Sequence, residues 1–587
     1  MSMQKTESNN KNFKINALFF RRVWKLYRMY WLRKTAWKSW VLLGLLGAVM
    51  AGYTYSGASF SVMTREATDA LVAKHQDEYI KFIILLSVYG FFRSLLTSLM
   101  PLIEGLINIR WWPWLAKDTI GKLLYKNNYY NIQYDSPIDN IDQRIEEEIS
   151  PVCSALVENP RAVIGSVGDT IVQASILYTL SPQLITLVLG YTLFRFFVTY
   201  FIYRPAIRQI FNIKIAEGDF RYSLMQTRNN AEQIALLRGE KAETSSIHGF
   251  LGQAINKTMI NVRYQWVIGM TSSIIMLLWD VLPMLILVPW YFKGHMSYGE
   301  VMQGVASASM MMMSFSILTF QIPQIINVAP SITRLAEVQE SNERNMSGGK
   351  HPENCIIRAV GNSLKITGLT IYIPGTKNLL LNDFNFELSP DKSGRQNIVI
   401  MGKTGSGKSS LFRVLSGLWF EGKGVVELPP EKDIFFLPQR PYLISGSLRD
   451  QFCYPFPVSA YNDEQLLAVI QLVNLSEMVN QYGSLDSVEN WKNCLSLGEQ
   501  QRIALARVIL AKPGYVFLDE ATSALDPDTE ANIYYQLFNM NINIITIAHN
   551  DTVIKYHHYL LQLHSDGEWT IENLLLPSNE IEPGLKK

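Results

Sequence analysis

Six long apolar segments in the first 330 residues constrain the fold of this chain more than any other feature. A bilayer core of roughly 30 Å is crossed by about 20 helical residues, and each segment has that length and character. The sequence therefore predicts an all-α membrane domain with six crossings, at residues 40–62, 80–107, 162–180, 184–203, 266–292 and 301–326. Because the chain has 587 residues and its second half lacks such segments, it holds at least two modules.

The residues before the first apolar segment are basic and aromatic. Between Lys11 and Lys38 there are nine Lys or Arg and no Asp or Glu. This pattern is typical of an amphipathic helix in the headgroup region of an anionic leaflet, with a merely solvated basic helix as the alternative. The charge also predicts a cytoplasmic N-terminus, and an even number of crossings returns the chain to the cytoplasm. Residues 1–39 are predicted as this segment, and residues 40–338 as the transmembrane domain.

Polar and charged residues in the first half have two expected uses. Two long polar intervals, residues 109–160 and 204–262, fall on the cytoplasmic side, and we expect them to extend the helices beyond the bilayer. An ionisable group at membrane depth usually faces a protein interior or a wet cavity, although it can also pair with a neighbour and fix helix packing. The ionisable residues within the crossings are Arg93, Asp169, Arg195 and Asp280.

The second half has the pattern of an α/β domain. Residues 339–355 lose both helical period and hydrophobicity and are predicted as a linker. Beyond it, in residues 356–587, short β-rich runs alternate with helical segments. The net charge of +2 gives no basic footprint for nucleic acid. The cysteines show neither a disulfide framework nor zinc-ligand spacing and are expected to be reduced. They are Cys153, Cys355, Cys453 and Cys494.

The run Gly-Lys-Thr-Gly-Ser-Gly-Lys-Ser at residues 402–409 is a phosphate-binding loop of the Walker A type. It follows an apolar strand and precedes a helix, the context that gives the pattern its meaning. Lys408 is expected to contact the β- and γ-phosphates of ATP, and Ser409 to offer its hydroxyl to Mg²⁺. Three glycines let backbone N–H groups curl around the phosphates without Cβ clashes. They are Gly402, Gly405 and Gly407.

The segment Tyr-Val-Phe-Leu-Asp-Glu at residues 515–520 brings two carboxylates to the phosphate end of the sheet. Asp519 is expected to hold Mg²⁺, directly or through water, and Glu520 to polarise the water that attacks the γ-phosphate. An ordinary strand that ends in two solvated acids is the alternative, which the upstream phosphate loop disfavours.

The segment Leu-Ser-Leu-Gly-Glu-Gln-Gln-Arg at residues 495–502 resembles the signature motif of the ABC transporter family, and the resemblance covers nearly the whole chain. It implies a six-helix transmembrane domain of the exporter (type IV) class fused to an α/β P-loop nucleotide-binding domain. In the implied head-to-tail dimer, Ser496 and Gly498 cap the γ-phosphate held by the other subunit. Leu497 and Glu499 depart from the commonest form of the motif, but neither change removes the contacting groups.

The same resemblance implies roles for residues elsewhere in the second half. Gln439 would sense Mg²⁺ and the attacking water beside the membrane domain, and His549 would be the switch histidine near the γ-phosphate. Residues 523–526 would form the loop that crosses the dimer interface. Many family members carry arginine after the switch histidine, where this chain has Asn550. Tyr372 is the candidate for stacking on adenine, with packing within a strand as the alternative.

Further segments look like one subgroup of this family. The subgroup contains the ABCD-type peroxisomal acyl-CoA half-transporters and bacterial transporters of the SbmA and BacA type fused to an ATPase. The form of the signature segment is similar to the bacterial side, which implies a bacterial inner membrane. The segments are residues 140–146, 220–222, 230–240, 409–419 and 439–442.

One chain carries one phosphate loop and one signature segment, so the resemblance implies a homodimer with two shared sites for ATP and Mg²⁺, embedded in membrane lipid. The expected cargo is a hydrophilic or amphipathic solute such as a peptide or cobalamin, taken up by the cell. Fatty acyl-CoA or other lipid-like cargo is the alternative, as is a membrane ATPase that acts as a sensor. The expected nucleotide ligands are Gly402, Gly405, Gly407, Lys408, Ser409, Ser410, Tyr372, Gln439, Ser496 and Gly498. The expected metal ligands are Ser409, Gln439 and Asp519, and the catalytic residues are Glu520 and His549.

Overall fold

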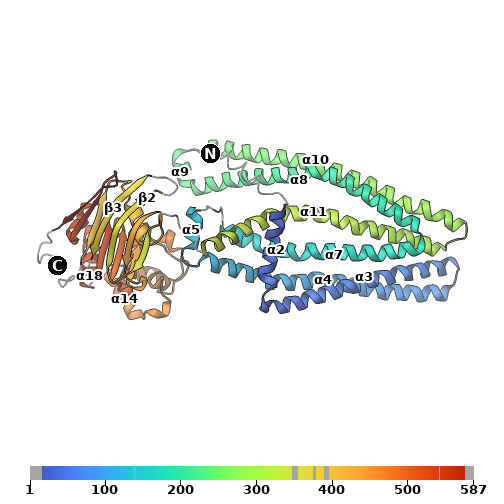
Figure 1. Ribbon diagram of the computed structural model, residues 1–587, viewed down its shortest axis with the longest axis horizontal. Coiled ribbons are helices and arrows are strands. Elements are labelled where there is room, and N and C mark those ends of the chain that lie inside the picture. Colours follow the sequence, from blue (N-terminus) through green and yellow to red (C-terminus); the bar gives the residue numbers. More distant parts are fainter. Residues whose placement is uncertain are drawn as a thin grey trace. The chain divides into compact units, whose positions relative to one another are not determined.

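The computed structural model describes residues 16–135, 138, 141–346, 355–373, 378–388, 396–540 and 542–574. The chain divides into two compact units, Met1–Met346 and Ser347–Lys587. In the described residues the first unit is helical, and the second contains both sheets and helices (Figure 1).

Long helices dominate the first unit (Figure 1). They are α3 (Trp37–Val72), α4 (Gln76–Leu123), α7 (Ile149–Leu180), α8 (Pro182–Asn229), α10 (Glu240–Phe292) and α11 (Tyr298–Met346). The shorter elements are α2 (Ala17–Trp31), the 3-10 helix η1 (Lys34–Ala36), α5 (Asn128–Asp135), α6 (Ile141–Gln143), the π-helix η2 (Arg144–Glu148) and α9 (Ala231–Leu237). At 1.5 Å per residue, α4 is about 72 Å long, more than twice the thickness of a bilayer core. The helix α4 continues from the second predicted crossing into the polar interval that begins at residue 109.

Each of the six predicted crossings lies within one of the long helices. Among the described residues, four helices are long and apolar enough to span a membrane. They are Lys34–Val72, Gln76–Leu123, Ile141–Leu180 and Glu240–Phe292. These four contain the first, second, third and fifth predicted crossings, so the chain has a multi-pass helical region and the count of six stays a prediction.

The basic segment before the first crossing forms α2, which has two apolar faces. One face is buried in the protein: Phe19 and Tyr30 have almost no exposed surface, and the Tyr30 ring stacks on Trp111 of α4 at 5.3 Å between centroids. The other face exposes Phe20 and Trp24. A helix with one face against protein and a second apolar face free is suited to the edge of a bilayer. Its aromatic residues therefore serve packing as well as the predicted lipid contact.

The polar end of α11 remains helical where the sequence predicts a linker from residue 339 onward. Arg22 of α2 donates two hydrogen bonds to Glu340, from Nε at 3.0 Å and from Nη2 at 2.9 Å. Lys25 donates one hydrogen bond from Nζ to the carboxylate of Glu343 at 2.5 Å. Charges on one element stabilise the helix end of another, so the loss of hydrophobic period does not mark the end of the helix here.

The second unit contains two sheets in its described residues. The four-stranded sheet has the order β1-β5-β2-β3, with β1 (Ile357–Val360), β2 (Leu364–Tyr372), β3 (Leu379–Leu388) and β5 (Gly422–Leu428). The six-stranded sheet has the order β10-β9-β4-β8-β7-β6, with β4 (Ile398–Gly402), β6 (Ile434–Leu437), β7 (Tyr515–Asp519), β8 (Asn543–Ile547), β9 (Tyr559–Leu563) and β10 (Trp569–Asn573). All neighbouring strands of the six-stranded sheet pair in parallel, except β9 and β10, which pair antiparallel. Residues that follow β4, β6, β7 and β8 therefore meet at one edge of this sheet.

Helices cover these sheets and complete the cores. They are α12 (Lys408–Leu415), α13 (Leu448–Cys453), α14 (Asp463–Leu472), α15 (Ser476–Tyr482), α16 (Trp491–Cys494), α17 (Leu497–Ala511) and α18 (Pro527–Asn539), with 3-10 helices η3 (Glu431–Asp433), η4 (Val458–Ala460) and η5 (Asp551–Tyr556). One core packs the six-stranded sheet against α13, α14, α17 and α18, and the other packs both sheets against α12. In the described residues, no disulfide bond joins the four cysteines.

Candidate functional site

The phosphate-binding loop connects β4 to α12, as the sequence predicts. Gly405 and Gly407 adopt positive φ angles of 88° and 93°, which only glycine takes without strain. A Cβ on Gly402 would lie 2.4 Å from the carbonyl oxygen of Leu563 on β9. Glycine is therefore needed at this position because another backbone passes too close for any side chain.

The ammonium of Lys408 lies at the mouth of this loop. Its Nζ donates hydrogen bonds to the carbonyl oxygens of Gly402 at 2.6 Å and Lys403 at 3.1 Å. Burial lowers the pKa of Lys408, while the charges of Glu520 and Asp519 oppose this effect. A buried cation at the start of a helix attracts phosphate strongly.

The two predicted carboxylates lie at the carboxyl end of β7. Burial raises the pKa of Asp519, and the neighbouring Glu520 adds to the increase. Arg413, His549 and Lys408 lower the pKa of Asp519 in return. A half-buried carboxylate next to a second carboxylate is well placed to bind a divalent metal ion.

Two residues that are far from Glu520 in the sequence hold its side chain. Gln439, after β6, donates from Nε2 to one carboxylate oxygen at 2.7 Å. His549, after β8, places Nε2 2.8 Å from the other oxygen. Both oxygens of the candidate catalytic carboxylate are thus fixed by residues that follow the two neighbouring strands, β6 and β8. The fold brings all three together at the predicted sheet edge.

The residues at this edge fit a nucleotide and Mg²⁺. Ser409 and Ser410 occupy the first turn of α12, and hydroxyl, amide and carboxylate oxygens are the ligands that Mg²⁺ prefers. The hydroxyl of Ser406 is buried within the loop and has no hydrogen-bond partner among the described residues. Buried hydroxyl groups normally form a hydrogen bond, and a phosphate oxygen of a bound nucleotide would accept one from Ser406.

Tyr372 lies one strand away from the phosphate loop. It is the last residue of β2 and pairs with Leu379 of β3. The next residue, Leu380, has its carbonyl oxygen 3.3 Å from where a Cβ on Gly407 would be. Tyr372 is half-buried, and stacking on adenine stays a prediction for it.

The signature segment forms the N-terminus of α17. Ser496 is the N-cap and forms a reciprocal capping box with Glu499, whose carboxylate accepts from the Ser496 backbone N–H at 2.8 Å. Glutamate in place of glutamine thus serves the helix N-terminus. Among the described residues, no hydrogen bond or ion pair joins Ser496 or Gly498 to the phosphate loop.

Two buried polar residues of α17 escaped the motif-based prediction. Gln501 is 1% exposed and Arg507 is 5% exposed. Arg507 donates to the carbonyl oxygens of Gln451 at 2.7 Å and Tyr442 at 2.8 Å, and burial lowers its pKa to about 10. The signal was present in the sequence, because both residues occupy core positions of a helix whose neighbours are apolar.

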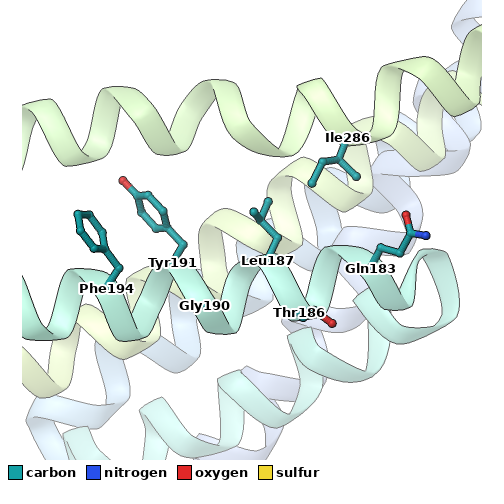
Figure 2. Close-up of a pocket in the computed structure, with 7 residues that line it drawn as sticks. All are labelled: Gln183, Thr186, Leu187, Gly190, Tyr191, Phe194 and Ile286. Atoms are coloured by element: carbon teal, nitrogen blue, oxygen red, sulfur yellow. The ribbon is translucent and has the colours of Figure 1, made fainter.

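The membrane region holds an open apolar hollow of about 700 Å³. In Figure 2, the side chains of Leu187, Tyr191 and Phe194 extend from α8 on the side of Ile286, which belongs to α10. The hydroxyl of Tyr191 donates to the carbonyl oxygen of Ile275 on α10. The remaining lining residues are Gln183, Thr186 and Gly190.

The predicted intramembrane charges have neighbours where the structure describes them. Arg93 donates to the hydroxyl of Tyr53 at 2.8 Å, and Asp169 accepts from the hydroxyl of Thr54 at 2.8 Å. Both partners lie on α3. Arg195 is part-buried on α8, and the side chain of Asp280 lies outside the described set.

Comparisons with known proteins agree with this architecture. The family model described as ABC transporter transmembrane region 2 matches residues 26–292, and the ABC transporter model matches residues 381–523. An uncharacterized ABC transporter ATP-binding protein from Synechocystis is 33% identical over 550 residues, which cover 91% of this chain and 82% of the relative. The chain belongs to the ABC transporter family. It is a multi-pass membrane protein whose ATPase activity drives transport.

Relatives of this ABC transporter include eukaryotic proteins of the D family. ABC transporter D family member 2, chloroplastic, from Arabidopsis thaliana is 28% identical over 94% of this chain and 88% of the relative. ATP-binding cassette sub-family D member 3 from Homo sapiens is 26% identical over 80% of this chain and 76% of the relative. The expected family is confirmed, and the predicted resemblance to D-type transporters agrees with these relatives.

Proposed function

We propose that the protein works as a homodimer that moves a solute across a bacterial inner membrane by alternating access, with its N-terminus and ATPase domain in the cytoplasm. The observation that carries this proposal is the single phosphate loop and single signature segment of each chain. The signature residues have no bond to the loop of their own chain within the described residues. Two copies arranged head to tail supply both halves of each ATP site.

Each site would divide its work between the subunits. The ammonium of Lys408 holds the β- and γ-phosphates, and the Glu520 carboxylate accepts a proton from the attacking water while Gln439 and His549 keep it oriented. Ser496 of the partner subunit would cap the γ-phosphate. Mg²⁺ on Ser409, Asp519 and Gln439 would offset the negative charge of the phosphates. Water attack on the γ-phosphorus then yields ADP and phosphate.

Coupling to the membrane would use the intervals near residues 140 and 232, of which residues 136–137 and 139–140 lie outside the described residues. In α9, Leu236 is 77% exposed and Leu237 is 82% exposed. Exposed leucines at the tip of a helical hairpin favour a docking role, because apolar side chains in water are covered when a partner binds. Closure of the paired ATPase domains would move these intervals and switch the cavity between the two membrane faces.

The substitution Glu520→Gln tests the catalytic assignment. It keeps the shape of the side chain and removes the base, so ATP turnover should fall at least about 100-fold while ATP binding stays within about threefold. Glu477→Gln, on exposed α15, is the matched control and should turn over ATP at the wild-type rate. Turnover near wild type in Glu520→Gln with intact binding would show that another group activates the water.

The cargo that we propose is a hydrophilic or amphipathic compound such as a peptide or cobalamin, taken up by the cell. Arg93 and Asp169 support it, since both lie within candidate membrane spans and charged groups at that depth serve polar passages. The alternative, fatty acyl-CoA or another lipid-like cargo, is favoured by the apolar hollow beside α8 and by the D-family relatives.

Reconstitution into sealed vesicles distinguishes these cargoes. Labelled cobalamin, peptide and acyl-CoA are offered separately, and ATP-dependent accumulation is compared between wild type and Glu520→Gln. Accumulation of acyl-CoA alone would replace the leading proposal by its alternative. ATPase stimulation without accumulation of any compound would favour a sensor.

A further inference from the structure

Gln501 joins the signature helix to the loop that follows the catalytic carboxylate. Its Nε2 donates to the hydroxyl of Ser523 at 3.2 Å and to the carbonyl oxygen of Glu520 at 3.4 Å. Its Oε1 accepts from the backbone N–H of Ala524 at 2.9 Å. Both ends of one buried amide therefore bind residues 520–524, which we name the catalytic loop.

The first turn of α17 fits against the same loop. A Cβ on Gly498 would lie 3.0 Å from the carbonyl oxygen of Ala524, so the signature glycine allows the close approach. Ser496, which caps this turn, lies five residues before Gln501 on the chain. A displacement of the turn therefore reaches the catalytic loop through the close contact at Gly498 and through the buried amide of Gln501.

The backbone of Glu520 is strained and depends on its surroundings. Its φ angle is 48°, in the left-handed region that non-glycine residues rarely adopt. Its N–H donates to the carbonyl oxygen of Ile547 at 3.0 Å. Its own carbonyl oxygen accepts from the backbone N–H of Ser523 at 3.1 Å and from the side chain of Gln501. Because few bonds hold this conformation, a shift of the catalytic loop moves the carboxylate that Gln439 and His549 orient.

We propose that Gln501 is a positioning residue through which one ATP site of the dimer controls the other. The inference rests on the proposed function, in which Ser496 and Gly498 contact the ATP bound by the second subunit. Engagement of that ATP shifts the first turn of α17. Gln501 transfers the shift to Ser523, Ala524 and the carbonyl of Glu520, and so aligns the carboxylate of its own chain. Hydrolysis in the two sites is then cooperative.

The substitution Gln501→Met tests this link, since it keeps the side-chain length and removes all three bonds. We expect kcat to fall at least about tenfold, because a small misplacement of a reacting group is costly. KM for ATP should stay within about threefold. The Hill coefficient for ATP should fall from near two, the limit for two coupled sites, to near one. Gln471→Met is the matched control, because it makes the same exchange at an exposed position of α14, and the Gln471 side chain forms no hydrogen bond to the catalytic loop in the described structure.

A second variant separates positioning from simple structural damage. Ser523→Ala removes one of the three partners of Gln501, so it should lower the Hill coefficient in the same direction by less. If both residues act through one contact, Ser523→Ala adds nothing to Gln501→Met, whereas independent sites have additive effects. Additive losses of kcat in the double variant would overturn the inference. Thermal unfolding of Gln501→Met checks that the loss does not come from a destabilised fold.

The outcomes distinguish this inference from the proposal on which it rests. A wild-type protein that stays monomeric with ATP and Mg²⁺ would refute the dimer. A wild-type dimer with cooperative hydrolysis, combined with equal cooperativity in Gln501→Met, would refute the role of Gln501 alone. A wild-type dimer with a Hill coefficient of one would also refute it, because there would be no coupling to transmit.

Discussion

Acid should loosen the ATPase domain through one buried histidine, His557. The side chain follows η5 and is fully buried. Its Nδ1 lies 2.7 Å from the carbonyl oxygen of Val553, and its Nε2 lies 2.8 Å from the hydroxyl of Thr546 on β8. Burial lowers the pKa of His557 to about 4, chiefly because a charged ring would lose its hydration.

The sign of the effect follows from where the proton binds. Between pH 6.5 and about 4 the unfolded chain holds a proton on His557 that the folded domain lacks, so the free energy of unfolding decreases as the pH falls. The stabilisation that the neutral His557 gives the folded domain is complete above about pH 6.5. Each pH unit in the window is worth about 1.4 kcal/mol, so acidification to pH 5 removes about 2 kcal/mol. Local opening should become about 30-fold more frequent.

Hydrogen–deuterium exchange of the full chain in lipid nanodiscs measures this opening. Peptides that cover β8 and η5 are compared at pH 7 and pH 5 after correction for intrinsic exchange. The variant His557→Gln removes the titrating group and should reduce the pH dependence by about 2 kcal/mol. Some dependence remains, because burial also lowers the pKa of His558. Equal pH dependence in the variant and the wild type would refute the reasoning.

Two further substitutions test close approaches in the structure. Gly402→Ala places a Cβ 2.4 Å from a backbone oxygen of β9, whereas Gly405 has no atom near its Cβ position, so ATP affinity should fall at least about tenfold more in Gly402→Ala than in Gly405→Ala. Fluorescent nucleotide binding measures both, and equal losses would contradict the steric argument. Asp69→Ala removes the acceptor of hydrogen bonds from the Ser297 hydroxyl and the Gly299 N–H, both at 2.7 Å. The free energy of unfolding should drop by about 1–3 kcal/mol, and an unchanged thermal midpoint in detergent would contradict this.

Sequence alone predicted which residues gather at one edge of the sheet, because the chemistry of the proposed ATP site needs particular residues at particular strand ends. Lys408 and Asp519 belong to contiguous motifs whose spacing is set by the phosphates and the metal ion. Gln439, Glu520 and His549 lie far apart in sequence, yet β6, β7 and β8 are neighbouring parallel strands. Since parallel strands present their carboxyl ends at one edge, a correct reading of the strands was enough to bring the three residues together.

Long-range side-chain partners explain what sequence analysis missed. Glu340 looked like part of a linker because its partner, Arg22, lies on a helix more than 300 residues earlier. Sequence analysis gave Gln501 no role of its own within the signature segment, because its bonds to Ser523 and Ala524 depend on how α17 packs. Phe19 looked like a lipid contact because no pattern within α2 tells which aromatic residues face protein. Such pairings are decided by the tertiary fold rather than by local pattern.

The exposure of its four cysteines gives this transporter a natural site for a fluorescent label. Cys153 and Cys453 are buried and Cys355 is half-buried, whereas Cys494 is exposed at the end of α16, directly before the signature segment. Burial raises the pKa of the Cys355 and Cys453 thiols, which keeps them protonated and slow to react. A maleimide dye should therefore attach first at Cys494, and in the proposed dimer its emission would follow the approach of the second subunit in real time without any engineered cysteine.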